Sequence, residues 1–251
     1  MSILPVLEIT GLQKVFGGIK ALDGIGLSVN QGEILGLIGP NGAGKTALLN
    51  TITGFYQANG GSIRFMGTEI TGLPLYKIGR LGIGRTFQNI RLFKRMSVLE
   101  NVLVAHKAHA TKPLASLFDF SGRAQGLASA MDLLSLMQLT DKATQSAASL
   151  SYGDARRLEI ARALAGSPEL LLLDEPAAGM NDAETEQLVQ DIQRIRHRVK
   201  AVVLIEHDMS LIRSLSDRAV AMDYGKKIAE GEVESVLSHP EVRRAYLGDD
   251  S

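Results

Sequence analysis

Short apolar runs separated by glycines open the chain. The stretches Leu7 to Thr10, Ile25 to Val29 and Glu33 to Ile38 predict three strands, with glycines at the turns before and between them. A further strand pair is expected around Ser62 to Phe65, and a helix from Lys45 to Thr53. The pattern predicts an antiparallel β layer that leads into a core strand and then a helix.

Helical spacing replaces this pattern over residues 93–138. Val98, Val102 and Ala105 fall on one face of a helix. A second set with the same spacing comprises Leu133, Leu136 and Met137. Between the two sets, Thr111 to Gly126 is rich in Pro, Ser and Gly without sustained periodicity, so we expect a loop or short helix at the tip of a helical lobe.

From Ser149 onward, helices alternate with strands that are apolar at every position. Fully apolar strands that alternate with helices are typical of a parallel sheet covered on both faces. Asn181 and Glu184 form a capping-box pattern at the start of one helix. The expected elements are a helix over 149–165, a strand over 170–173, a helix over 182–198, a strand over 202–205, a hairpin from 220–222 and 227–229, and a helix over 234–246.

These elements predict one α/β domain with a phosphate-loop NTPase core, a mainly parallel sheet, an N-terminal antiparallel β layer and an inserted α-helical lobe. Composition agrees, because 45% of the 251 residues are hydrophobic and 22% are charged. The expected division is a single domain over 1–251, with core subdomains over 1–88 and 156–251, a helical subdomain over 89–155, and a C-terminal hairpin and helix over 218–251.

The balance of charged residues limits the partners that the chain could bind. Basic and acidic residues both number 27, so no global field draws the chain to nucleic acid or to an anionic membrane. Cysteine is absent, which excludes disulfides and thiolate metal sites. No signal-peptide pattern and no apolar run near the roughly 20 residues of a bilayer span is present, so we expect a cytosolic chain that reaches membranes through a partner.

A phosphate-binding motif follows the third predicted strand. Its residues are Gly39, Pro40, Asn41, Gly42, Ala43, Gly44, Lys45 and Thr46, with Ala47 next. The glycines let backbone N–H groups turn toward a β-phosphate at a helix N-terminus, while Lys45 would reach the β- and γ-phosphates and Thr46 would bind Mg²⁺. The alternative, a glycine-rich turn that binds nothing, would require neither the lysine nor the hydroxyl.

Two acidic residues stand where ligands bind in open α/β sheets. Asp174 and Glu175 directly follow four leucines, at the carboxyl end of a buried strand. Phosphoryl transfer requires a carboxylate near the metal and a group that positions or deprotonates water. We assign these roles to Asp174 and Glu175 in turn, with a solvated charge pair as the alternative.

His207 follows the next apolar strand and could reach a γ-phosphate, although a histidine at the end of a strand is more often structural. His106 and His109 are spaced like a metal pair on a predicted helix, but no further ligand cluster accompanies them. We therefore interpret both as surface or partner contacts.

Five motifs in a fixed order resemble those of the ATP-binding-cassette (ABC) ATPases. They are the phosphate loop, RTFQN with Gln88, LSYGD at 150–154, LLLLDEP at 170–176, and IEHD with His207. LSYGD discriminates best, because most phosphate-loop enzymes lack it.

The resemblance implies a nucleotide site shared between two subunits that are paired head to tail. Phe16 would stack on the adenine, and Gln88 would join the Mg²⁺ and water shell and link the core to the lobe. Ser151 and Gly153 would bind the γ-phosphate held by the second subunit, together with residues 179–181. Catalytic roles would then fall to Glu175, His207, Gln88 and Lys45, and metal binding to Thr46, Gln88 and Asp174. A plain core phenylalanine is the alternative for Phe16.

Within the family, the chain is similar to the ATPases of branched-chain amino acid importers. The similarity rests on RTFQNIRLFKRMSVLENVLVAHK, RRLEIARALA and the tail EVRRAYLG. It implies ATP and Mg²⁺ as cofactors, a like or unlike second ATPase, permease subunits contacted through the lobe near residues 91–100, and an indirectly coupled periplasmic or extracellular binding protein. The chain would lie at the inner face of the cell membrane, held there by the permease.

Three residues depart from the usual family pattern: Ala47, Asp154 and Asn181. We expect Asp154 to place negative charge beside the partner's nucleotide and to weaken ATP-driven closure. The alternative functions are a lipopolysaccharide-export ATPase, a soluble cassette protein acting on ribosomes or DNA, and a non-hydrolysing binding module.

Overall fold

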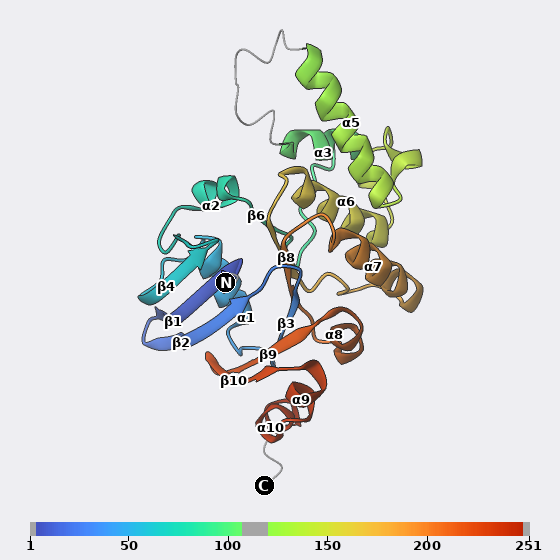
Figure 1. Cartoon of the computed structure of the whole chain (residues 1–251). Helices are drawn as coiled ribbons and strands as arrows, with labels where there is room; N and C mark the ends of the chain where they lie inside the picture. Colours follow the sequence, from blue (N-terminus) through green and yellow to red (C-terminus); the bar gives the residue numbers. More distant parts are fainter. Residues whose placement is uncertain (1–3, 107–119, 248–251) are drawn as a thin grey trace.

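The computed structural model describes residues 4–106 and 120–247 and contains two β-sheets flanked by helices (Figure 1). A four-stranded antiparallel sheet has the order β2-β1-β4-β5, and a six-stranded sheet has the order β10-β9-β3-β8-β7-β6. All neighbouring strands of the second sheet are parallel except β10 and β9. The predicted fold class is confirmed.

Between residues 152 and 223, helices alternate with strands as the sequence indicated, whereas the elements at 75–81, 83–85 and 209–215 were not predicted. The strands are β1 (Leu7–Phe16), β2 (Ile19–Val29), β3 (Ile34–Ile38), β4 (Gly60–Phe65), β5 (Thr68–Glu69), β6 (Ile83–Arg85), β7 (Leu170–Asp174), β8 (Ala201–Ile205), β9 (Arg218–Asp223) and β10 (Lys226–Gly231). The α-helices are α1 (Lys45–Ile52), α2 (Leu75–Leu81), α3 (Val98–Ala105), α5 (Phe120–Leu136), α6 (Tyr152–Ala165), α7 (Asp182–Ile195), α8 (Met209–Leu215), α9 (Val233–Ser238) and α10 (Pro240–Leu247). Two 3₁₀ turns, Thr140–Lys142 and Ala147–Ser149, precede α6.

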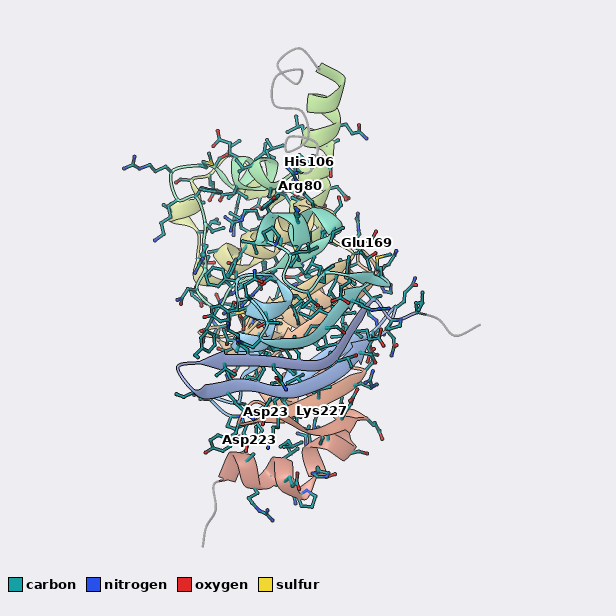
Figure 2. All side chains as sticks on the ribbon, turned by 90° about the vertical axis from the view of Figure 1, so that its left-hand side faces the viewer. Asp23, Arg80, His106, Glu169, Asp223 and Lys227 are labelled. Atoms are coloured by element: carbon teal, nitrogen blue, oxygen red, sulfur yellow. The ribbon has the colours of Figure 1, made fainter. Side chains whose placement is uncertain are left out.

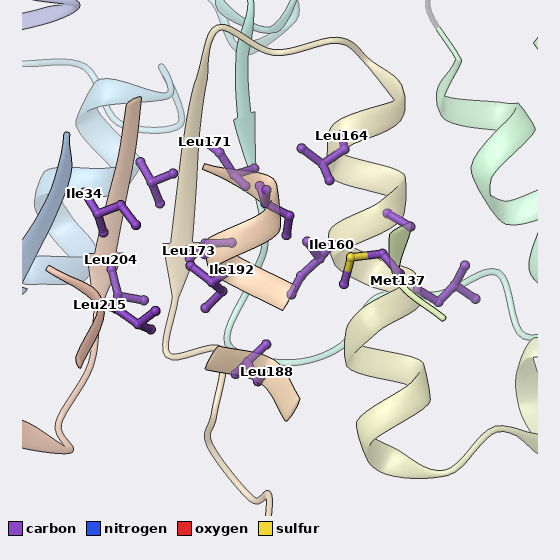
Figure 3. Packing of buried hydrophobic residues seen from close by; sticks show 14 of the residues in the cluster. Ile34, Met137, Ile160, Leu164, Leu171, Leu173, Leu188, Ile192, Leu204 and Leu215 are labelled. Atoms are coloured by element: carbon purple, nitrogen blue, oxygen red, sulfur yellow. The ribbon is translucent and has the colours of Figure 1, made fainter. Parts of the chain in front are cut away.

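The central strands are buried on both faces, so alternate residues enter two different cores. On β7, Leu171 and Leu173 join a core with the helical lobe, α7 and α8, whereas Leu170 and Leu172 join a core with α1 and the antiparallel sheet. Figure 3 shows the first core, in which Leu171 and Leu173 face Ile192 of α7 and Ile160 of α6. Because side chains alternate along a strand, the four leucines of β7 serve both cores.

The helical lobe consists of α3, α5 and α6 and lies at one end of the molecule (Figure 1). Ser97 and Glu100 form a capping box that starts α3, and Ser151 caps α6. Of the loop or short helix predicted over 111–126, residues 120–126 are helical and form the first turns of α5, which is longer than the short helix expected; residues 111–119 lie outside the described ranges. Helix α6 continues across the predicted boundary between residues 155 and 156, and the division into subdomains stays a prediction.

The C-terminal segment differs from the predicted single helix. It forms two short helices: α9 ends before His239, and α10 begins at Pro240. Proline lacks the N–H that would continue the helix and disfavours a helical conformation in the residue before it. The hairpin β9–β10 that precedes these helices also meets the antiparallel sheet: the Asp23 N–H donates to the Gly225 carbonyl at 2.8 Å, and Asp23 Oδ2 lies 3.7 Å from Lys226 Nζ (Asp23 is labelled in Figure 2).

Candidate functional site

The phosphate loop joins the end of β3 to the first residue of α1, as the motif predicted. Gly39, Gly42 and Gly44 have φ angles of 152°, 86° and 102°, in the region that disfavours side chains. A Cβ at Gly39 would lie 2.2 Å from the Met222 carbonyl oxygen, and one at Gly44 would lie 2.5 Å from the Ala21 carbonyl oxygen. The loop can therefore follow this path only with glycine at these two positions.

Lys45 points back into the loop. Its Nζ donates to the carbonyl oxygens of Gly39 at 2.6 Å and Pro40 at 3.0 Å. Burial lowers the pKa of this ammonium group, while the nearby Glu175 and Asp174 carboxylates act in the opposite direction. A buried cation at a helix N-terminus fits a phosphate group, which would replace these carbonyls as its partner.

Asp174 ends β7 and is 3% exposed. Arg85 Nη2 donates to its Oδ2 at 2.7 Å, and Arg85 Nη1 donates to Asn50 Oδ1 at 2.7 Å, which ties β6, β7 and α1 together. This buried ion pair excludes the solvated charge pair considered as the alternative. The predicted metal shell of Thr46, Gln88 and Asp174 contains only one carboxylate, and its role toward Mg²⁺ stays a prediction.

Glu175 lies between two of the predicted catalytic residues. Its Oε2 accepts a hydrogen bond from Gln88 Nε2 at 2.6 Å, and its Oε1 lies 2.6 Å from His207 Nε2. Glu175 itself has a φ of 48°, and its N–H donates to the Ile205 carbonyl at 3.0 Å. The three side chains come from the ends of different segments, and the structure brings them together as predicted. The cluster fixes both oxygens of the Glu175 carboxylate at the end of the sheet, and its catalytic role stays a prediction.

Glu206 is a buried carboxylate that the sequence analysis did not single out. Its Oε1 accepts from the Ala177 N–H at 2.8 Å and its Oε2 from the His207 N–H at 3.3 Å. Burial raises the pKa of Glu206 to about 7, with repulsion from Glu175 and Asp208 adding to the effect. Its place beside His207 in IEHD was the only sequence signal that could have indicated it.

The LSYGD segment forms the N-terminus of α6. Ser151 Oγ accepts from the Asp154 N–H at 3.2 Å and donates to Asp154 Oδ2 at 3.0 Å. Asp154 is 8% exposed and forms ion pairs with Lys142 at 2.5 Å and Arg157 at 3.5 Å. These two cations offset the negative charge of Asp154, from which weakened ATP-driven closure was predicted. The effect of Asp154 on closure stays a prediction.

Gly153 connects this segment to the start of α7. Its N–H donates to Glu184 Oε1 at 3.3 Å, and a Cβ at Gly153 would lie 2.8 Å from the same oxygen. Glu184 also completes the predicted capping box with Asn181, which is confirmed. One carboxylate therefore holds both the LSYGD backbone and the cap that follows residues 179–180.

Arg156 joins the same helix to the Gln88 segment. It is fully buried, and its guanidinium donates to the carbonyl oxygens of Phe87 at 2.7 Å and Gln88 at 2.8 Å. Glu159 balances its charge at 2.8 Å. The segment RRLEIARALA carries a family resemblance, but nothing in its local pattern indicates that Arg156 is buried.

Phe16 is 41% exposed, which contradicts the alternative of a plain core phenylalanine. Its ring contacts Tyr56 edge to face, with centroids 5.0 Å apart, and Lys14 Nζ lies 4.7 Å from its centroid. An aromatic face at the end of β1 is thus accessible to a planar base.

The remaining histidine assignments concern the lobe. His106 directly follows α3 and lies on the helical lobe (Figure 2), and His109 lies outside the described residues. Across residues 4–106 and 120–247, no cluster of three or more His, Cys, Asp or Glu side chains could hold a metal ion. None of the helices in these ranges combines the length and hydropathy of a bilayer span.

Comparison with known protein families matches residues 22–178 to the family described as ABC transporter. The chain belongs to this family. Residues 226–251 also match the family described as branched-chain amino acid ATP-binding cassette transporter. The chain is therefore the ATP-hydrolysing subunit of a transporter, and the resemblance noted in the sequence is confirmed.

Relatives match along the whole length of this ABC ATPase. It is 47% identical to the high-affinity branched-chain amino acid transport ATP-binding protein BraF of Pseudomonas aeruginosa over 252 residues, 98% of each chain. It is 43% identical to the LivG protein of Escherichia coli, which has the same description, over 251 residues and 98% of each chain. The solved ADP conformation of MJ1267, an ATP-binding cassette of an ABC transporter, has a TM-score of 0.87 at 34% identity, over 98% of this chain and 100% of that one.

Proposed function

We propose that this chain hydrolyses Mg-ATP to energise the import of branched-chain or related amino acids. The observation that carries the proposal is Glu175, held between Gln88 and His207 on a chain that also has an intact phosphate loop. The cargo is inferred from relatives that this chain matches over 98% of their length and that are described as branched-chain amino acid transport ATP-binding proteins.

ATP binding uses the phosphate loop and Lys45. The loop backbone and the N-terminus of α1 present N–H groups and a partial positive charge to the β-phosphate. Lys45 then exchanges the Gly39 and Pro40 carbonyls, its partners at 2.6 and 3.0 Å, for phosphate oxygens. Phe16 stacks on the adenine, and Pro40, Asn41, Ala43 and Ala47 shape the loop around the phosphates.

Hydrolysis uses the Glu175 cluster. Glu175 orients water and accepts its proton as the water oxygen bonds to the γ-phosphorus and the bond to the ADP oxygen breaks. Gln88 and His207 hold the two Glu175 oxygens and set the direction of the carboxylate. Mg²⁺, held by Thr46, Gln88 and Asp174, would neutralise charge on the β- and γ-phosphate oxygens.

The complete site requires a second ATPase subunit, like or unlike, arranged head to tail. Ser151 and Gly153 would face the γ-phosphate held by that subunit. The described contacts support rigid presentation of these residues, because Asp154 holds Ser151 and Glu184 holds Gly153. A relative solved as a dimer, the cassette MJ0796 bound to ADP and Pi, has a TM-score of 0.75 at 25% identity over 90% of this chain and 98% of that one.

An apolar groove at the junction of the core and the lobe fits a helix of a permease subunit. Phe55, Leu75, Ile78, Phe87 and Arg91 are among the residues that line it, and Phe55 and Leu75 are 63% and 51% exposed. Arg91, the first residue of the predicted contact segment 91–100, lines the groove. Because Gln88 follows the groove residue Phe87 and donates to Glu175, permease motion can reach the catalytic carboxylate. The chain would then sit at the inner face of the membrane, with an external binding protein coupled through the permease.

The alternative transporters are less well supported. The match of residues 226–251 to a branched-chain amino acid transporter family does not favour lipopolysaccharide export. The equal numbers of basic and acidic residues, 27 each, argue against a soluble cassette protein that binds nucleic acid.

The test uses Glu175→Gln, with Glu186→Gln on the exposed face of α7 as the matched control. Glu175→Gln is expected to bind Mg-ATP without turnover, whereas Glu186→Gln should hydrolyse it like the wild type. Light scattering then reports mass: a dimer formed only with Mg-ATP indicates that one chain completes both sites, and an ATP-binding monomer indicates an unlike partner. A wild-type chain that fails to bind ATP refutes the proposal.

A further inference from the structure

The C-terminal helix α10 contacts the first residue of the phosphate loop. The Gly39 N–H donates a hydrogen bond to Tyr246 Oη at 2.7 Å, across 207 residues of sequence. Burial raises the pKa of Tyr246, so the hydroxyl remains protonated and neutral at physiological pH. Because Gly39 is itself buried, this hydroxyl supplies a partner to an N–H group that water reaches poorly.

The Tyr246 side chain is 36% exposed, but the helix that carries it is anchored by packing. Val242, four residues earlier on the same face of α10, is 2% exposed and belongs to the main core. Val233 and Val236 of α9 enter the same core, and Arg213 of α8 pairs with Glu234 at 2.8 Å. Together these contacts hold α9 and α10 against the end of the sheet.

Both backbone polar groups of Gly39 are hydrogen-bonded to side chains. Its N–H binds Tyr246, and its carbonyl accepts from Lys45 Nζ at 2.6 Å. When Lys45 turns to the phosphates of ATP, the carbonyl loses that partner. Tyr246 then still holds the Gly39 N–H, at a position where the chain passes so close to Met222 that a Cβ on Gly39 would lie 2.2 Å from the Met222 carbonyl oxygen.

Tyr246 also lines a hollow together with His207 and Met209. The Tyr246 hydroxyl thus contacts the phosphate loop, and its side chain borders the same hollow as His207, which contacts Glu175. The C-terminal helix therefore contacts the phosphate loop and shares a hollow with His207.

We propose that Tyr246 is a positioning residue for the phosphate loop, through which α10 and ATP binding are coupled. This inference rests on the proposed function. Without the hydroxyl, the loop in its ATP-bound form has one fewer bond holding Gly39, and the binding-competent population falls. A hydrogen bond of ordinary strength corresponds to a loss of ATP affinity of about three- to tenfold. Coupling is reciprocal, so ATP binding should also stabilise α10.

The test compares Tyr246→Phe with Tyr224→Phe in the full chain. Tyr224 is 85% exposed beside the same loop, so its variant also removes one tyrosine hydroxyl near the site. ATP affinity is measured by calorimetry in the Glu175→Gln background, and amide hydrogen exchange over residues 240–247 is measured with and without ATP. In the assembled transporter, Tyr246→Phe should raise KM and leave kcat within about twofold, a split that general destabilisation of the helix would not produce.

The expected result is a three- to tenfold weaker ATP affinity for Tyr246→Phe alone, with loss of the ATP-dependent protection of α10. Equal affinities for the two variants, with wild-type protection retained, would overturn the inference while leaving the proposed function in place. Absence of ATP binding by the wild type would refute the proposed function and this inference with it.

Discussion

Glu206 provides a quantitative test of the electrostatics around Glu175. The carboxyl group is 4% exposed, and burial raises its pKa from 4.5 to about 7. Replacing it with glutamine removes the titration but preserves the size of the side chain. The amide oxygen can keep the 2.8 Å bond from the Ala177 N–H, while the amide N–H₂ cannot accept the 3.3 Å bond from the His207 N–H. That lost bond costs about 1 kcal/mol at every pH.

The pH dependence follows from the direction of the shift. A carboxyl whose pKa is higher in the folded state binds more protons there, so its stabilising contribution is full below about pH 4.5 and is lost as the pH rises through about 7. The difference between the two pKa values corresponds to about 3 kcal/mol, of which about 2 to 3 kcal/mol falls between pH 5 and pH 8. Glu206→Gln should therefore gain stability relative to the wild type over this interval.

Urea unfolding at several pH values between 5 and 8 measures this difference. Glu8→Gln, an exposed glutamate on β1, is the matched control and should show no comparable trend. The reasoning is wrong if the stability difference between Glu206→Gln and the wild type stays constant across the interval, or if it changes in the opposite direction.

Two further predictions concern the start of α6. Arg156→Met should lower the free energy of unfolding in urea by about 3 to 5 kcal/mol, because it leaves Glu159 buried and unpaired. The double variant Arg156→Met with Glu159→Met should lose less stability than Arg156→Met alone. An equal loss for the two variants would contradict the pairing. Lys142→Met removes the nearest cation from Asp154 and should weaken ATP-driven association with the second subunit, as measured by light scattering. Adding Asp154→Gln should restore association, because it removes the unbalanced charge; no recovery would argue against this electrostatic account.

The parts of the site that depend on contiguous residues could be predicted from the sequence. The phosphate loop requires glycines, a lysine and a hydroxyl within eight positions, and the structure adopts it between β3 and α1. The Asn181 capping box is equally local and was confirmed. The apolar strands predicted the parallel sheet, because a strand buried on both faces has few polar positions.

Only the tertiary structure decided which distant side chains meet. The pairing of Asp174 with Ile205 across β7 and β8 sets Glu175 beside His207, and the pairing of Arg85 with Leu172 brings Arg85 to Asp174. No single sequence motif determines either of these two strand registers. The buried charges were missed for the same reason: Arg156 and Glu206 resemble surface residues until packing removes them from water, and Tyr246 reaches Gly39 only after α10 docks on the core. A sequence motif determines the chemistry that a short segment can perform, whereas burial and long-range contacts arise from the packing of the whole chain.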